Sequence, residues 1–149
     1  MKNYYRIMRV NCSTLRRMPF TPDQTLLALY NRTQFMVRAE GGEPVYFTMG
    51  DATLPEAVRK KQFAIITAWN PMNNMMPLEE NRSRNRELED ILKEQKYVYY
   101  PSLGTCEHHV EESFTIEQIP QADAVALGKR FGQHAIVFCD GVGVGFLFP

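Results

Sequence analysis

The sequence lacks the features that identify a membrane or secreted protein. No run of 18 apolar residues occurs, and the first residues lack the unbroken apolar stretch of a secretory signal. The three cysteines, Cys12, Cys106 and Cys139, are odd in number and widely spaced, which argues against a disulfide framework and suits a reducing compartment. We therefore expect a soluble, cytoplasmic protein without membrane association.

Net charge is also absent. Seventeen Lys and Arg residues balance seventeen Asp and Glu residues, so the chain exerts little long-range attraction on phosphate. Nucleic-acid binding has no compositional support outside residues 1–20, which are basic and which we interpret as an N-terminal arm. With 149 residues and 44% hydrophobic content, we expect a single domain spanning 1–149.

Established catalytic and cofactor motifs are missing as well. The segment Cys106-Glu107-His108-His109 is the densest group of potential metal ligands, but two adjacent histidines rarely bind one ion, and neither CxxC nor HExxH occurs. A thiol beside an imidazole can be nucleophilic, yet nothing places the Cys106 sulfur at an oxyanion site. We predict no metal site and no cofactor.

The feature that is present, and that organises the rest, lies between Phe63 and Glu94. Residues Phe63–Trp69 are apolar on both faces of a strand, which predicts a central position in a sheet, and Pro71 forces this strand to end. A helix follows over residues 78–94, and one of its faces carries Leu78, Asn81, Asn85, Leu88 and Leu92. The two asparagines should therefore point inward, toward the end of the strand.

The remaining pattern predicts an α+β fold. Before the central strand, we expect a helix capped by Thr21 and ending near Asn31, a hairpin of 34–37 with 45–49, and a short helix at 54–58. After the helix at 78–94, we expect a strand 97–100 ended by Pro101, a turn at Gly104 before a loop 105–110, and a half-buried strand near 111–116. A helix 120–131 and a hairpin of 134–139 with 142–148 complete the chain. The sheet should be mixed or antiparallel, with five to seven strands and helices mostly on one face. The second half is compatible with a ferredoxin-like split βαβ unit.

Several spaced motifs carry a resemblance. They are TAWNP (67–71), EEN (79–81), Gly104, EESF (111–114) and FGQHAI (131–136). Together they resemble the bacterial family DUF3293, a domain of unknown function, over roughly residues 32–149. The resemblance implies a small, mostly intracellular bacterial protein and no agreed activity.

The candidate site lies where the central strand ends. Its ligand-binding residues would be Asn70, Asn81, Asn85, Ser113 and Gln133. Inward amides can bind a polar ligand, but they can equally satisfy backbone groups that Pro71 leaves unpaired, and the second interpretation is the more frequent. Glu111 is the candidate general base, with Glu79 or Glu80 as a second carboxylate, although strand glutamates are usually solvated.

Two functions remain open, and the residues do not decide whether the protein is an enzyme. In the first, the protein binds a small polar ligand, a nucleotide or related metabolite, in a cleft at the strand end. In the second, it is a non-catalytic interaction module that uses the basic arm and the loop carrying Met72, Met75 and Met76. That loop could also be a lid, or its methionines could pack beneath the helix. The oligomeric state is left open.

Overall fold

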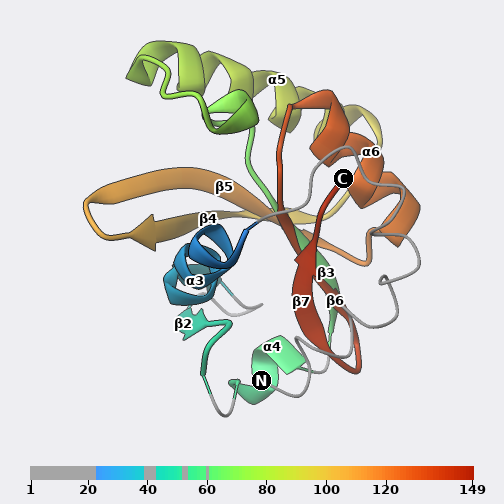
Figure 1. The fold of residues 1–149 in the computed structure, drawn as a ribbon. Coiled ribbons are helices and arrows are strands. Elements are labelled where there is room, and N and C mark those ends of the chain that lie inside the picture. The colour runs from blue at the N-terminus through green and yellow to red at the C-terminus, as the bar shows by residue number, and fades with distance from the viewer. Residues whose placement is uncertain (1–22, 39–42, 52–53, 60) are drawn as a thin grey trace.

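The computed structural model describes residues 23–38, 43–51, 54–59 and 61–149. Their elements are α3 (Gln24–Arg32), β1 (Gln34–Arg38), β2 (Pro44–Thr48), α4 (Glu56–Arg59), β3 (Gln62–Ile66), the 3-10 helix η1 (Pro71–Asn73), α5 (Leu78–Glu94), β4 (Tyr99–Cys106), β5 (His109–Glu117), α6 (Gln121–Arg130), β6 (Ile136–Asp140) and β7 (Val144–Leu147). The strands form one sheet in the order β2-β1-β4-β5-β3-β6-β7 (Figure 1). All neighbouring strands are antiparallel, which confirms the α+β prediction.

The middle of the sheet has the ferredoxin-like arrangement. Strands β4, β5, β3 and β6 lie side by side, α5 connects β3 to β4, and α6 connects β5 to β6. Each of these connections therefore skips over one strand, which is the split βαβ pattern. The β1–β2 hairpin extends this unit beyond β4, and β7 extends it beyond β6.

The sheet buries side chains on both of its faces. Ala64 and Ile66 of β3 join one cluster with α5 and α6, whereas Phe63 and Ile65 join a second cluster with β1, β7 and α4. Figure 1 shows α5 and α6 together over one face, with α3 and α4 on the opposite side of the curled sheet. The two-sided apolar pattern of β3 is thus explained by its place inside the sheet, between β5 and β6.

Strand β3 is shorter than predicted. It ends at Ile66, not at Trp69, and residues 67–70 leave the ladder before Pro71 is reached. Side chains, not a neighbouring strand, satisfy the peptide groups of this exit segment, as described below. The sequence pattern does not distinguish a segment that pairs with a neighbouring strand from one that is bound by side chains, because both kinds of segment are mostly apolar and largely buried.

The predictions for β4 were wrong at two residues. Pro101 does not end the strand but pairs within it, opposite Phe114, and Gly104 is a strand residue opposite Glu111. Proline is tolerated because β1 pairs only with residues 103–105 of β4, so at position 101 no ladder bond to β1 is lost. The predicted loop 105–110 is a tight hairpin turn, with Cys106 opposite His109 and Glu107 at φ 53°.

Two helix predictions also need correction. Helix α3 is capped by Asp23, whose carboxylate accepts the Leu26 N–H at 2.8 Å, and Thr21 lies outside the described residues. Helix α5 has the predicted bounds, but Leu78 at its start is 49% exposed, so the buried stripe begins at Asn81. The basic arm of residues 1–20 and the hairpin turn at 40–42 lie outside the described residues. Within the described ranges, no helix has the length and hydropathy needed to cross a bilayer.

Candidate functional site

The segment that leaves β3 is held by side chains from α5 and from the segment that follows α6. Asn85 of α5 accepts the Ala68 N–H at 2.8 Å and donates to the Glu112 carbonyl at 2.7 Å. Asn81, one turn earlier, accepts the Asn70 N–H at 2.8 Å. Both asparagines are buried, with 2% and 5% exposure for Asn81 and Asn85, as their place on the helix stripe predicted. They replace the ladder bonds that end at Ile66.

Carbonyl groups of the same segment are satisfied too. Arg84 donates from Nε to the Ala68 carbonyl at 2.8 Å and from a terminal nitrogen to the Phe131 carbonyl at 3.0 Å. Gln133 donates to the Trp69 carbonyl at 2.8 Å. The end of β3 is thereby tied both to α5 and to the segment that follows α6.

Asn70 is the hub of this arrangement. Its side-chain oxygen accepts from Asn81 at 2.9 Å and from the Met76 N–H at 3.0 Å, while its amide nitrogen donates to Glu111 at 2.9 Å. The bond to Glu111 joins the loop after β3 to the β4–β5 hairpin. It also leaves Glu111 with one oxygen oriented by the protein.

The loop that carries Asn70 has a strained backbone. Asn70, Met72 and Asn73 all have left-handed conformations, with φ of 44°, 55° and 58°. Asparagine adopts this region readily, whereas Met72 does so at a cost of about 1–2 kcal/mol. The Met72 N–H donates to the Gly132 carbonyl at 2.7 Å, which helps to hold the conformation. Strain of this kind is often found where a protein must present side chains to a ligand.

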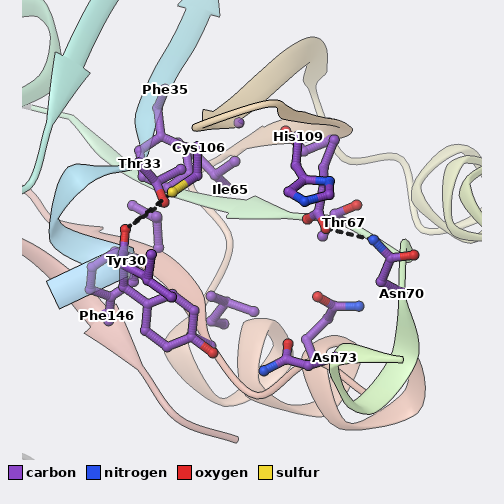
Figure 2. A pocket seen from close by; sticks show the side chains of 18 of the residues that line it. Tyr30, Thr33, Phe35, Ile65, Thr67, Asn70, Asn73, Cys106, His109 and Phe146 are labelled. Carbon is purple, nitrogen blue, oxygen red and sulfur yellow. Dashed lines mark hydrogen bonds between the residues drawn. The ribbon is translucent and has the colours of Figure 1, made fainter. Parts of the chain in front are cut away.

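A pocket of about 460 Å³ opens beside this loop, on the α3 side of the sheet. Figure 2 shows Asn70 and Asn73 facing into it from the loop, His109 from the β4–β5 hairpin, and Tyr30 from α3. Its wall is formed by Leu26, Leu29, Tyr30, Thr33, Phe35, Ile65, Thr67, Asn70, Asn73, Met75, Gly104, Cys106, Glu107, His109, Glu111, Ser113, Gln133, Ala135, Ile136, Val137 and Phe146. A volume of this size is typical of a site for a small molecule.

Residues 66–136 match the family model described as a protein of unknown function, DUF3293. This segment belongs to the DUF3293 family. The match confirms the resemblance carried by the spaced motifs. A search of curated proteins and a search of solved structures each gave no match.

The DUF3293 segment supplies only part of the pocket. It contributes the loop after β3, the β4–β5 hairpin and Gln133, whereas α3, β1 and β7 lie outside the matched residues. Tyr30, Phe35 and Phe146 complete the wall from those three elements. The single domain over residues 1–149 and the extension of the family over 32–149 both stay predictions.

Four of the predicted site residues meet at this pocket. Asn70, Glu111, Ser113 and Gln133 all line it. Asn81 and Asn85 do not, since they lie behind the loop with their amides engaged by backbone and by Asn70. Glu79 and Glu80 are exposed in the first turn of α5 and also lie outside the lining.

Sequence reasoning missed several residues that line the pocket. Tyr30 lies on the helix that was predicted to end near Asn31, and its ring belongs both to the core beside Phe146 and to the pocket wall. Burial raises the pKa of the Tyr30 hydroxyl above its usual value, an Asn73 hydrogen bond lowers it, and the negative charge of Glu111 raises it. Only the tertiary fold brings these three side chains together.

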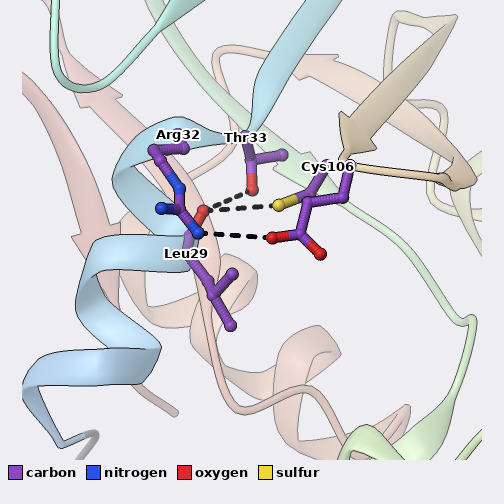
Figure 3. Close-up of polar contacts among 5 residues, drawn as sticks. Leu29, Arg32, Thr33 and Cys106 are labelled. Carbon is purple, nitrogen blue, oxygen red and sulfur yellow. Dashed lines mark hydrogen bonds and ion pairs between the residues drawn. The ribbon is translucent and has the colours of Figure 1, made fainter.

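Cys106, at the end of β4, contacts the C-terminal end of α3 (Figure 3). The Leu29 carbonyl at the end of α3 accepts from the Thr33 hydroxyl at 3.0 Å and from the Cys106 thiol at 3.7 Å. Beside it, Arg32 and Glu107 form an exposed ion pair at 3.4 Å. Among the described residues, no group of three or more His, Cys, Asp or Glu side chains is placed to hold a metal ion.

Proposed function

We propose that this protein binds a small polar ligand in the pocket beside the end of β3. The observation that carries the proposal is the convergence of Asn70, Glu111, Ser113 and Gln133 on one cavity of about 460 Å³. These residues come from three separate parts of the chain, and the pocket also has apolar walls, as small-molecule sites usually do. A nucleotide or related metabolite is the class expected from the sequence.

Within this proposal the polar residues have two different roles. Asn70 and Glu111 face the ligand, and their mutual hydrogen bond of 2.9 Å sets the orientation of the carboxylate. Asn81 and Asn85 are positioning residues, because they hold the loop that presents Asn70. If the ligand is hydrolysed, Glu111 is the residue that would act as general base.

The proposal is tested by a thermal-shift screen of nucleotides, nucleosides and other small metabolites. A ligand at 100 times its Kd would stabilise the protein by about 2.7 kcal/mol. The screen is repeated with Gly104→Leu, since Gly104 lines the pocket and an added Cβ would lie 3.5 Å from the Phe35 ring without a clash. A longer side chain there should fill the cavity and abolish the shift.

A matched control is Ser83→Leu on the exposed face of α5, which adds the same side chain away from the pocket. This variant should keep every shift that the unaltered protein shows. The proposal is wrong if no compound stabilises the protein, or if Gly104→Leu binds its ligand as well as Ser83→Leu does.

A second function is supported by the exposure of two loop methionines. Met72 is 56% exposed and Met75 is 68% exposed, so these side chains are available to a protein partner. We propose this interaction surface as the alternative. It predicts that Met72→Ser, at a loop methionine outside the pocket lining, abolishes capture of a specific partner and leaves ligand-induced shifts in place.

We also propose a cytoplasmic location and a bacterial origin. The first is supported by the few, widely spaced cysteines and the second by the resemblance to DUF3293. Nucleic acid is not proposed as a partner, because the neutral overall charge offers phosphate no strong attraction.

A further inference from the structure

The wall of the pocket contains two acids and the imidazole of His109, but no lysine or arginine among the described residues. The two acids are Glu107 and Glu111. Two arginines of the described residues have other partners. Arg32 pairs with Glu107 on the rim, and Arg84 donates to two backbone carbonyls behind the loop.

Glu111 is the acid that faces the interior. Its Oε1 accepts from Asn70, and no salt bridge to Glu111 occurs among the described residues. The next residue along β5, Glu112, differs in this respect, since it pairs with Arg82 at 3.0 Å and does not line the pocket. Of these two adjacent carboxylates, the one in the cavity thus has no cationic partner within the described part of the chain.

The opposite side of the pocket is a hydrogen-bonding surface with no lysine or arginine among its described residues. Tyr30 and Asn73 both line it, and the pKa of the Tyr30 hydroxyl is raised by burial, lowered by Asn73 and raised by the negative charge of Glu111. Figure 2 shows Asn73 and Tyr30 across the cavity from His109. A group that donates hydrogen bonds could be held between these oxygen atoms and the carboxylate.

The inner wall is apolar. Phe35, Ile65 and Phe146 line it, together with Leu29, Ile136 and Val137. This surface can cover an aromatic ring or a short aliphatic chain. The pocket therefore has one apolar region and one anionic region, within a volume that suits a molecule of modest size.

We propose that the pocket takes an organic amine with an aromatic or aliphatic body, whose ammonium group pairs with Glu111, and that it rejects phosphate esters and carboxylates. This inference rests on the proposed function and narrows the ligand class to molecules without a phosphate. A phosphate at the same position would face an unneutralised carboxylate and would find no lysine or arginine in the described wall.

The test uses matched pairs of probes in isothermal titration calorimetry. Phenethylamine is compared with 3-phenylpropionate and with 2-phenylethyl phosphate, each against the full chain. Phenethylamine should bind at least tenfold more tightly than either of the two anions. Gly104→Leu should abolish binding of the amine.

Glu111→Gln tests the assigned partner. Glutamine keeps an oxygen that can accept from Asn70 but removes the charge, so amine affinity should fall at least tenfold and the preference over the carboxylate should vanish. Glu112→Gln is the matched control, because it removes the same charge from the neighbouring residue outside the pocket. Its amine affinity should stay within about twofold of the unaltered protein, since an exposed pair outside the site contributes little.

The two proposals fail in different ways. If carboxylate or phosphate probes bind in the pocket as tightly as amines, or if Glu112→Gln weakens the amine as much as Glu111→Gln does, the amine assignment is wrong and ligand binding stands. If a library compound of another class binds in the pocket and no amine does, the same conclusion follows. If neither the probes nor any library compound binds, both proposals are overturned.

Discussion

Two side chains converge on the carbonyl of Glu112, and removing both should cost more than the sum of the separate losses. Asn85 donates to this carbonyl at 2.7 Å, and so does the Thr67 hydroxyl. In Asn85→Leu, the carbonyl still accepts from the Thr67 hydroxyl, and in Thr67→Val it still accepts from Asn85. In the double variant it has neither side-chain donor.

The expected magnitudes follow from the groups that each change orphans. Asn85→Leu leaves the buried Ala68 N–H without its acceptor, which should cost about 1–3 kcal/mol. Thr67→Val removes the acceptor of the Trp69 N–H, a part-buried bond of 3.1 Å, at a cost of about 1 kcal/mol. The double variant should lose a further ~1–3 kcal/mol, because the Glu112 carbonyl then has no side-chain donor.

The assay is equilibrium urea unfolding of the four proteins. Their free energies of unfolding are compared with the same dependence on urea concentration applied to all four. A cycle of Thr67→Val with Asn81→Leu is the control, because Asn81 makes no bond to Glu112 and this cycle should close within about 0.5 kcal/mol. Additive losses in the Asn85 cycle would refute the shared-carbonyl reasoning. So would an Asn85→Leu variant as stable as the unaltered protein.

Two further predictions concern pH and glycine geometry. Burial lowers the pKa of His134 below 6.5, so the stabilisation from its neutral form is present above pH 6.5 and is lost as the pH falls through and below that value. The free energy of unfolding of the unaltered protein, measured from pH 7.5 to 5.5, should show this loss, and His134→Asn should remove it. Equal pH dependence of the two proteins would contradict the assignment. Gly132→Ala should lower the melting temperature more than Gly141→Ala. Both glycines have positive φ, so alanine costs about 1–2 kcal/mol at either site, but a Cβ at 132 would also lie 3.0 Å from the Pro71 Cβ, whereas a Cβ at 141 would meet no atom within 4 Å. Equal losses would show that the contact with Pro71 is relieved.

Elements with a strong local pattern could be predicted from the sequence. Helix α5 has its predicted bounds because its apolar and amide residues recur on one face for 17 residues. Strand β3 was placed inside the sheet because its residues are apolar on both faces, and the β6–β7 hairpin because Asp140-Gly141 is a strong turn signal. In each case the deciding physics is local.

Features that depend on distant partners could not be predicted. Pro101 reads as a strand end, and only the short overlap of β1 with β4 explains why it is tolerated. Asn81 and Asn85 were correctly predicted to point inward, and their bonds to backbone agree with the more frequent interpretation of inward amides, but their spacing does not show which backbone groups they bind. Tyr30 enters the pocket wall only because α3 packs near β7, a contact between segments more than a hundred residues apart.

The interleaved order of the strands has a consequence for the chain as it leaves the ribosome. Strand β3 is synthesised early, yet its two partners are β5, which begins at His109, and β6, which ends at Asp140. Until β5 and β6 have both been synthesised, at least one edge of the apolar strand β3 lacks its hydrogen-bonding partner. We expect α5, the next long element made, to pack first against β3. Chains stalled before residue 136 should therefore depend most on chaperones.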